Sequence, residues 1–236
     1  MKVLVMLPTL NEKENIAALI IKIFELPIAN LEIVVVDDQS PDGTARIVED
    51  LTRTFARLHL IRRSGPGGRG LAGREGYIYG LKSEMDFLVE MDGDFSHDPK
   101  HIPSMLDAMS RCDLAIGSRF VAGGADLDRP FFRHWLTIAA NAYARSLLGL
   151  EVRDTNSGFR CFSREALARI APESLRSRGP SIVHEVLFKA RRARLRIAEI
   201  PIEFVDRKKG SSKLNLARLA AGYLWILKMR LGPVHK

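Results

Sequence analysis

Short apolar runs alternate with longer segments of helical periodicity along the first half of the chain. Residues 33–36 form a continuous β-branched and apolar run, typical of a central strand buried on both faces. Residues 11–26 instead space their apolar side chains three and four apart, the period of an amphipathic helix. This alternation predicts a doubly wound α/β domain with a mostly parallel sheet flanked by helices. The predicted strands are 3–7, 33–36, 58–61, 87–91, 114–117 and 197–205, and the predicted helices are 11–26, 42–55, 71–81, 99–109 and 131–148.

The second half is less regular. Residues 154–160 are typical of a tight turn, and no internal repeat or linker interrupts the chain. From about residue 214, apolar side chains recur at near-helical spacing, which predicts an amphipathic helix that binds a membrane surface, a partner subunit or its own domain. We therefore expect one domain over residues 1–212, followed by a basic amphipathic helix and tail over 213–236. The apolar face of that helix would consist of Leu216, Leu219, Ala220, Tyr223, Leu227 and Leu231.

The charge is unevenly distributed along the 236 residues. Lys and Arg number 36 against 28 Asp and Glu, a formal net charge of +8, and the segment 207–236 contains basic residues and no acid. The longest apolar run, 219–227, is about half of the roughly 20 residues that a membrane-spanning helix needs. Cys112 and Cys161 lack metal-site spacing and are expected to be buried reduced thiols. We expect a cytoplasmic protein that lies peripherally on the cytoplasmic face of a membrane.

Paired acidic residues follow the predicted strands. Asp37 and Asp38 end one strand, and Asp92 and Asp94 end another in an Asp-Gly-Asp turn. The carboxyl ends of parallel strands form the edge where open α/β sheets bind ligands. Mg²⁺ and Mn²⁺ prefer oxygen ligands and often share one or two carboxylates with substrate phosphates. The second pair therefore predicts a metal–diphosphate site.

A glycine-rich segment supports a different interpretation. Gly65, Gly67 and Gly70 match the G-x-G-x-x-G pattern of dinucleotide-binding proteins, with Glu90 about twenty residues further on. Three features argue against an NAD(P)-binding oxidoreductase. The glycine-rich run does not follow the first strand, it contains a proline, and arginines flank it. A basic loop near phosphates is the favoured interpretation. His97, His101 and His184 lack a third ligand at metal-site spacing and are expected to be solvated or to cap helices.

The motifs, taken in order, resemble those of a known family. They match the successive blocks of the dolichol-phosphate (polyprenol-phosphate) mannosyltransferases, which are inverting family 2 glycosyltransferases of GT-A fold. The resemblance extends over about residues 3–214, with Leu10 in a position that is usually tyrosine. The blocks are Pro8–Glu12, Val36–Thr44, Met91–His97, Gly117–Phe120, Asp154–Arg160 and Asp206–Leu214.

The resemblance implies a role for particular residues. Asp94 and Ser96 would be ligands of Mg²⁺ or Mn²⁺, and Asp94, Arg119 and Arg133 would be the catalytic residues. Arg119, Arg133, Arg207 and Lys213 would hold the donor diphosphate and the acceptor phosphate. The residues that would bind the nucleotide sugar are Pro8, Leu10, Glu12, Val36, Asp38, Asp92, Gly93, Asp94, Arg119, Arg207 and Lys213.

The implied reaction is transfer of mannose from GDP-mannose to a polyprenyl (dolichyl or undecaprenyl) monophosphate at the membrane surface. A phosphate acceptor has its second pKa near 6, so it is mostly ionised at pH 7 and needs no dedicated general base. A UDP-sugar donor, glucose or N-acetylglucosamine, is the alternative within the same fold. Membrane contact is expected directly or through a small membrane-anchor subunit. Nucleic acid is not an expected partner, because no base-stacking aromatic stripe or recognisable module is present.

Overall fold

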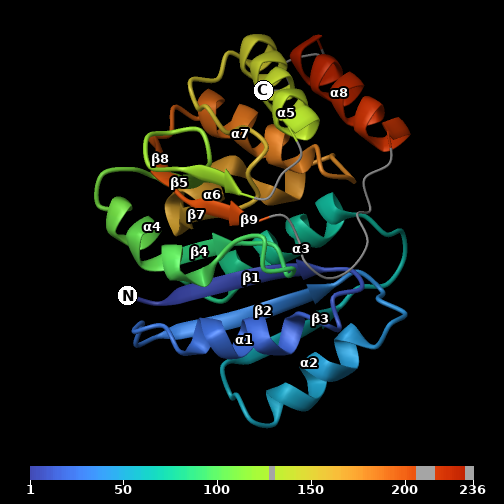
Figure 1. Cartoon of the computed structure of the whole chain (residues 1–236). Coiled ribbons are helices and arrows are strands. Elements are labelled where there is room, and N and C mark those ends of the chain that lie inside the picture. Colours follow the sequence, from blue (N-terminus) through green and yellow to red (C-terminus); the bar gives the residue numbers. More distant parts are fainter. Residues whose placement is uncertain (128–130, 206–215, 232–236) are drawn as a thin grey trace.

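A seven-stranded sheet forms the centre of the protein in this computed structural model (Figure 1). The structure describes residues 1–127, 131–205 and 216–231, apart from the side chains of 131–134, 216–221 and 223. The strand order is β3-β2-β1-β4-β7-β5-β8, and a two-stranded sheet pairs β6 with β9. The strands are β1 (Val3–Thr9), β2 (Leu31–Asp37), β3 (Leu58–Arg62), β4 (Phe87–Glu90), β5 (Leu114–Ser118), β6 (Ala125–Leu127), β7 (Arg160–Ser163), β8 (Ile197–Pro201) and β9 (Glu203–Val205).

Helices cover both faces of the sheet, and the pleat of the strands sorts the core into two layers. In β1, Val3, Val5 and Leu7 pack on one side, while Leu4 and Met6 pack on the other. Figure 1 shows α1 and α2 on one side of the sheet, and α5, α7 and α8 on the opposite side. The helices are α1 (Ile16–Phe24), α2 (Thr44–Thr52), α3 (Arg69–Lys82), α4 (Ile102–Ala108), α5 (Phe131–Leu148), α6 (Arg164–Ile170), α7 (Ile182–Arg192) and α8 (Leu216–Leu231), with short 3₁₀ turns at Pro99–His101 and Pro172–Ser174.

The prediction of a doubly wound, mostly parallel sheet is confirmed, but three of its details were wrong. Residues 160–163 form β7, which lies antiparallel between β4 and β5 instead of continuing a turn. The predicted strand 197–205 divides into β8 and β9, which belong to different sheets. Helix α1 begins at Ile16, because the backbone amides of residues 11–13 donate to side chains of the 40–44 segment.

Strand β7 has an unusual composition for the interior of a sheet. It begins at Arg160, whose side chain is completely buried. Its guanidinium donates to the backbone oxygen of Ser157 at 2.9 Å and to that of Val183 at 2.7 Å. A buried arginine is tolerated because these carbonyls replace water. The same residue interrupts the apolar pattern, which explains why the sequence did not reveal the strand.

Helix α8 packs on the main domain, against α5 and α7. Its Ile226 is fully buried and joins the same core layer as Leu4 and Met6. The boundary at residues 212/213 lies outside the described residues. In the described part of the chain, no helix has the length and apolarity that crossing a bilayer requires.

Candidate active site

The order of the strands creates a crevice between β1 and β4. From β1 the chain proceeds to β2 and β3 on one side, and then crosses to β4 on the other side of β1. Such a switch point separates the loops that follow the two strands, and ligands of open α/β sheets bind there. A Cβ on Gly93 would lie 3.1 Å from Cγ2 of Thr9 and 3.6 Å from Cγ of Glu12. Glycine is therefore what lets the loop after β4 pack closely against the segment after β1.

The carboxylates of the first acidic pair, at the end of β2, bind donors from the protein itself. Asp37 accepts hydrogen bonds from the Thr9 hydroxyl at 3.2 Å, and from the Ser40 amide at 2.9 Å and hydroxyl at 2.6 Å. Asp38 accepts from the Gly68 amide at 2.6 Å and forms an ion pair with Arg63. Both carboxylates are buried. The glycine-rich loop is thus held against the residue predicted to bind the nucleotide.

The second acidic pair forms a compact turn after β4. Oδ1 of Asp94 accepts a hydrogen bond from the Ser96 amide at 3.1 Å, and both residues are buried. Between them, Phe95 has a φ of 63°, a left-handed conformation that few residues other than glycine and asparagine adopt. Asp92 is more open, with 39 % of its side chain exposed. The turn thus brings two carboxylates and a hydroxyl to the mouth of the crevice.

The chemistry of this turn fits a hard divalent cation. Carboxylate and hydroxyl oxygens are the ligands that Mg²⁺ and Mn²⁺ prefer. In the described part of the chain, no group of three or more His, Cys, Asp or Glu side chains is placed to hold a metal ion by itself. A cation shared between one or two carboxylates and substrate phosphates does not require such a group.

His97 supports the acidic turn from behind, so the expectation of a solvated or capping histidine was wrong. Its ring is 2 % exposed and stacks on Phe159 at 5.1 Å between centroids. Nδ1 accepts a hydrogen bond from the Asp92 amide at 3.2 Å. Burial lowers the pKa of His97 below its usual value, even though Asp92 and Asp94 act in the opposite direction. His184 is also buried, which corrects the same expectation for that residue.

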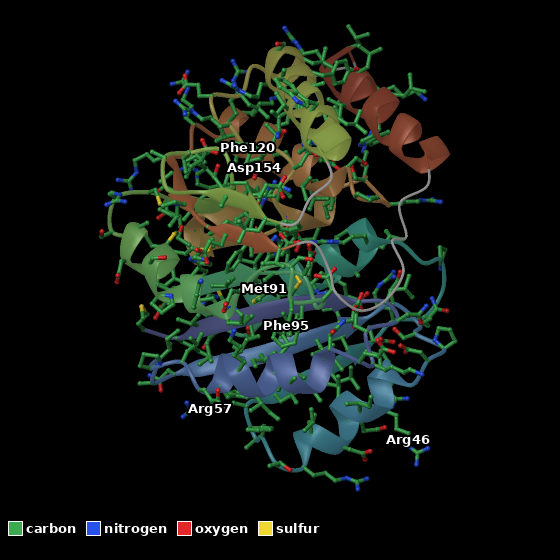
Figure 2. The ribbon with its side chains drawn as sticks, in the orientation of Figure 1. Arg46, Arg57, Met91, Phe95, Phe120 and Asp154 are labelled. Atoms are coloured by element: carbon green, nitrogen blue, oxygen red, sulfur yellow. The ribbon has the colours of Figure 1, made fainter. Side chains whose placement is uncertain are left out.

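Arg119 lies on the β5 side of the crevice and is held by a buried aspartate. Nε and Nη2 of Arg119 donate to the two carboxylate oxygens of Asp154 at 2.7 and 2.8 Å. Burial alone would lower the pKa of Arg119, but the paired Asp154 raises it above the usual value. The Phe120 ring lies 5.3 Å from the Arg119 guanidinium carbon, and Figure 2 labels both Phe120 and Asp154. One edge of the guanidinium is therefore fixed by the protein.

The turn that carries Asp154 is fastened to α5. Oδ1 of Asn141 accepts hydrogen bonds from the Thr155 amide at 2.9 Å, the Thr155 hydroxyl at 2.7 Å and Nδ2 of Asn156 at 2.8 Å. Asn141 could not be identified from the sequence, because a single asparagine within a helical pattern carries no motif. Its contacts link the helix to the loop that orients Arg119.

Arg69 and Glu90 also lie at this site, although no sequence motif assigned them to it. Nη1 of Arg69 lies 2.7 Å from Oε1 of Glu90, and Nη2 lies 3.4 Å from Oδ1 of Asp92. Glu90 is completely buried and also accepts a hydrogen bond from the Tyr77 hydroxyl. Its carboxylate is therefore closed to a ribose, and the dinucleotide-binding interpretation loses its acidic residue. The combination of a glycine-rich loop and an acid about twenty residues later was the available signal.

The structure brings most of the predicted site residues to one edge of the sheet. Pro8 and Val36 are register partners at the ends of β1 and β2, although the Val36 side chain is buried beneath α3. Leu10 is exposed. Arg207 and Lys213 lie outside the described residues, as does the side chain of Arg133. The predicted residues that do lie around the crevice are Leu10, Glu12, Asp38, Asp92, Gly93, Asp94, Ser96 and Arg119.

Comparison with known proteins identifies the family. Residues 4–171 match the model of glycosyl transferase family 2. The chain belongs to this family. It is 36 % identical over 216 residues to the polyprenol monophosphomannose synthase of Mycolicibacterium smegmatis, covering 91 % of this chain and 81 % of that protein. It is 35 % identical over 215 residues to the undecaprenyl-phosphate mannosyltransferase of Micrococcus luteus, covering 91 % and 88 %. The resemblance to polyprenol-phosphate mannosyltransferases that the motifs predicted is confirmed by these two relatives.

Solved structures confirm the fold. Glucosyl-3-phosphoglycerate synthase from Mycobacterium tuberculosis, in complex with Mn²⁺, UDP and glucosyl-3-phosphoglycerate, superposes with a TM-score of 0.69 at 21 % identity, covering all of this chain and 81 % of that one. A further mycobacterial protein superposes with a TM-score of 0.70 at 20 % identity, covering 99 % and 76 %. The glycosyltransferase therefore has the GT-A-like arrangement of a mostly parallel sheet flanked by helices.

Proposed function

We propose that this glycosyltransferase transfers mannose from GDP-mannose to a polyprenyl monophosphate, with inversion at the anomeric carbon. The observation that carries the proposal is the Asp92–Ser96 turn, which packs through Gly93 against the Thr9–Glu12 segment at the β1/β4 switch point. That is where a nucleotide sugar would bind in this fold. The names of the two mannosyltransferase relatives support mannose as the sugar and a polyprenyl phosphate as the acceptor.

The chemistry follows from the charges around the crevice. An oxygen of the acceptor phosphate attacks the anomeric carbon from the face opposite to the nucleoside diphosphate, and the bond from that carbon to the diphosphate oxygen breaks. The phosphate nucleophile is already mostly ionised at pH 7, so no side chain has to remove its proton. Arg119 is the described cation best placed to bind a phosphate, since the arginine fork matches phosphate geometry. Arg133, Arg207 and Lys213 are proposed to act with it.

Asp94 and Ser96 are proposed to hold Mg²⁺ or Mn²⁺ against the donor diphosphate. The oxygen ligands of their turn suit either ion, and the Mn²⁺–UDP complex of the structural neighbour supports a divalent cation in this fold. When bound, the cation would stabilise negative charge on the departing diphosphate. Leu10 lacks the aromatic face that tyrosine would offer to a base, so the choice between GDP-mannose and a UDP-sugar rests on the relatives.

We further propose that the enzyme works on the cytoplasmic face of a membrane, where the lipid acceptor resides. Large apolar side chains are exposed on the two adjacent helices α5 and α8, alongside exposed Lys228 and Arg230. Such a combination favours interfacial binding, because basic side chains near anionic lipid contribute about 1 kcal/mol each. A small membrane-anchor subunit is the alternative means of attachment. The exposed apolar residues are Trp135, Leu136, Tyr143, Leu224, Leu227 and Leu231.

A transfer assay tests the proposed reaction. The full chain is incubated with labelled GDP-mannose, UDP-glucose or UDP-N-acetylglucosamine, a short polyprenyl phosphate, and Mn²⁺, Mg²⁺ or EDTA. We expect a lipid-linked product from GDP-mannose that depends on the cation. Product only from a UDP-sugar would change the donor, and no lipid-linked product from any donor would refute the function. Quenching or enhancement of NADH fluorescence by the protein would instead favour the oxidoreductase alternative.

Membrane attachment is tested with point substitutions instead of a deletion. Deleting α8 would uncover the core around Ile226, so loss of binding after deletion would not be informative. Leu224→Gln and Leu231→Gln alter exposed positions of the helix and should reduce co-sedimentation with anionic liposomes without changing GDP binding. Ile21→Gln, at an exposed apolar position of α1, is the matched control and should not reduce co-sedimentation. Unchanged co-sedimentation of both α8 variants would exclude this helix as the attachment site.

A further inference from the structure

Arg69 occupies a slot that is built around its side chain. It is the first residue of α3, and the neighbouring Gly70 donates its amide to the Arg178 carbonyl at 2.9 Å. A Cβ on Gly70 would come within 2.2 Å of the Ser177 carbonyl oxygen, so only glycine fits there. Further along the slot, a Cβ on Gly73 would lie 3.1 Å from Nη1, and one on Gly158 would lie 3.3 Å from Nη2. The guanidinium is thus confined between α3 and the turn before β7.

The two terminal nitrogens of the Arg69 guanidinium have different partners. Behind it is Glu90, fully buried, bound by the Tyr77 hydroxyl and 2.7 Å from Nη1. In front is Asp92, part of the proposed diphosphate site and 3.4 Å from Nη2. A buried carboxylate is costly unless it is paired and hydrogen-bonded, so Glu90 holds Arg69 firmly. Arg69 therefore connects the interior of the sheet to the acidic turn.

We propose that Arg69 is a positioning residue for the donor diphosphate, which acts by holding and neutralising the Asp92 carboxylate, and that Glu90 and Tyr77 fix Arg69 in place. The inference rests on the proposed function. Two adjacent carboxylates, Asp92 and Asp94, would repel a nucleoside diphosphate unless positive charge lies close to them. A cation bound at Asp94 would neutralise one of them. Arg69 neutralises the other from the protein side.

This assignment also explains residues that the transfer chemistry does not use. The glycine-rich loop and Glu90, which suggested a dinucleotide site, meet at this ion pair. Gly158, in the turn before β7, lies against both Arg69 and Asp92, since a Cβ there would lie 3.5 Å from each Asp92 carboxylate oxygen. Arg69 keeps its charge: burial alone would lower the pKa of its guanidinium, but the carboxylates of Glu90 and Asp92 raise it above the usual value.

The test compares four variants of the full chain with the wild type. Arg69→Met removes the cation, Arg69→Lys keeps the charge without the two-sided fork, and Glu90→Gln keeps the shape but removes the charge that holds Arg69. Arg196→Met is the matched control: it also removes one positive charge, from an exposed pair with Asp113. Titration calorimetry measures binding of GDP and UDP with Mn²⁺, transfer assays give KM for donor and acceptor separately, and thermal unfolding monitors the fold.

We expect Arg69→Met to raise the Kd for GDP–Mn²⁺ and the donor KM by about 10- to 100-fold, the effect of losing a charged hydrogen bond, with the acceptor KM unchanged. Arg69→Lys should recover part of this loss, Glu90→Gln should lose severalfold, and Arg196→Met should match the wild type. A folded Arg69→Met protein with wild-type affinity would overturn the inference, as would equal losses in donor and acceptor KM. If Arg69→Met does not fold, Glu90→Gln decides the matter in the same two ways. A wild-type protein that binds neither GDP nor UDP would overturn the proposed function and this inference with it.

Discussion

The two acidic turns at the carboxyl edge of the sheet have similar sequences and different environments. Asp37 and Asp38, after β2, are bound on all sides by hydroxyls, backbone amides and Arg63. Asp92, after β4, keeps 39 % of its side chain exposed, and Asp94 lies next to it in a turn closed by the Ser96 amide. The first pair stabilises the loops of the site, whereas in the second pair Asp94 is buried and Asp92 remains open to the crevice.

The difference shows that position at a strand end does not by itself give a carboxylate a chemical role. What matters is how many protein donors each carboxylate meets. Around Asp37 three donors converge, so few positions remain for a ligand. The Asp92 side chain instead keeps 39 % of its surface exposed, with a nitrogen of Arg69 at 3.4 Å, while its backbone amide donates to the His97 ring. Substitutions in the two turns should therefore have different effects on activity and stability.

The largest effect is expected from Asp94→Ala. This change removes the proposed cation ligand and should lower kcat by at least about 100-fold, the scale of losing one electrostatic contact in a transition state. The fold should be retained, because Asp94 lies in a turn at the edge of the sheet and not in either core layer. Single-turnover transfer at increasing Mn²⁺ measures the effect, with Asp107→Ala, an exposed residue of α4, as the control. Full cation-stimulated activity in Asp94→Ala would show that the second turn, like the first, does not bind the cation.

Asp37→Ala should have the opposite profile. It leaves three donors without their acceptor, two from Ser40 and one from Thr9, and should reduce the free energy of unfolding by about 2–4 kcal/mol. The rate per folded molecule should change little. Urea denaturation and the transfer rate, corrected for the folded fraction, measure the two quantities. A stable protein with no transfer activity would place Asp37 in the chemistry instead.

Asp38→Asn should give an intermediate result. Arg63 keeps a second partner, because its Nε lies 2.9 Å from Glu75, so we expect a stability loss of only about 1–2 kcal/mol. GDP binding should weaken as well if the glycine-rich loop leaves its place at the nucleotide pocket. Calorimetric titration of GDP together with urea denaturation tests both effects. Unchanged GDP affinity would show that Asp38 belongs with Asp37, as a residue that serves only the fold.

The smallest effect at neutral pH is expected for His184, which belongs to neither turn and whose contribution appears as the pH falls. Burial, with Arg160 nearby, lowers the pKa of His184 from 6.5 to about 3. Between these two pH values His184 is protonated in the unfolded chain and neutral in the folded chain. The free energy of unfolding is therefore at its full value above pH 6.5 and falls as the pH decreases. The slope approaches about 1.4 kcal/mol per pH unit for this group. Urea denaturation between pH 7.5 and 5 should show a shallower slope for His184→Gln, and an equal slope would contradict the prediction.

Most of the fold could be predicted because the strands β1, β2 and β4 are continuous apolar runs and their helices are periodic. Strand β7 was missed because Arg160 opens it, and this buried arginine is satisfied by backbone carbonyls that include the distant one of Val183. Among the site residues, Asp92, Asp94 and Ser96 share one turn and were identified from their motif. Arg69 and Asn141 were not, because their significance depends on partners 14 to 23 positions away.

The sequence by itself determined the doubly wound sheet, the acidic turns at its edge and the family, since local periodicity and short motifs are encoded by neighbouring residues. Only the tertiary structure decided which carboxylates meet protein donors and which face the crevice. It also decided that Glu90 holds Arg69 instead of a ribose, and that His97 supports the Asp92 backbone instead of facing water. The physical reason is that burial and pairing are set by segments that the fold brings together, and burial and pairing determine what a charged side chain can do.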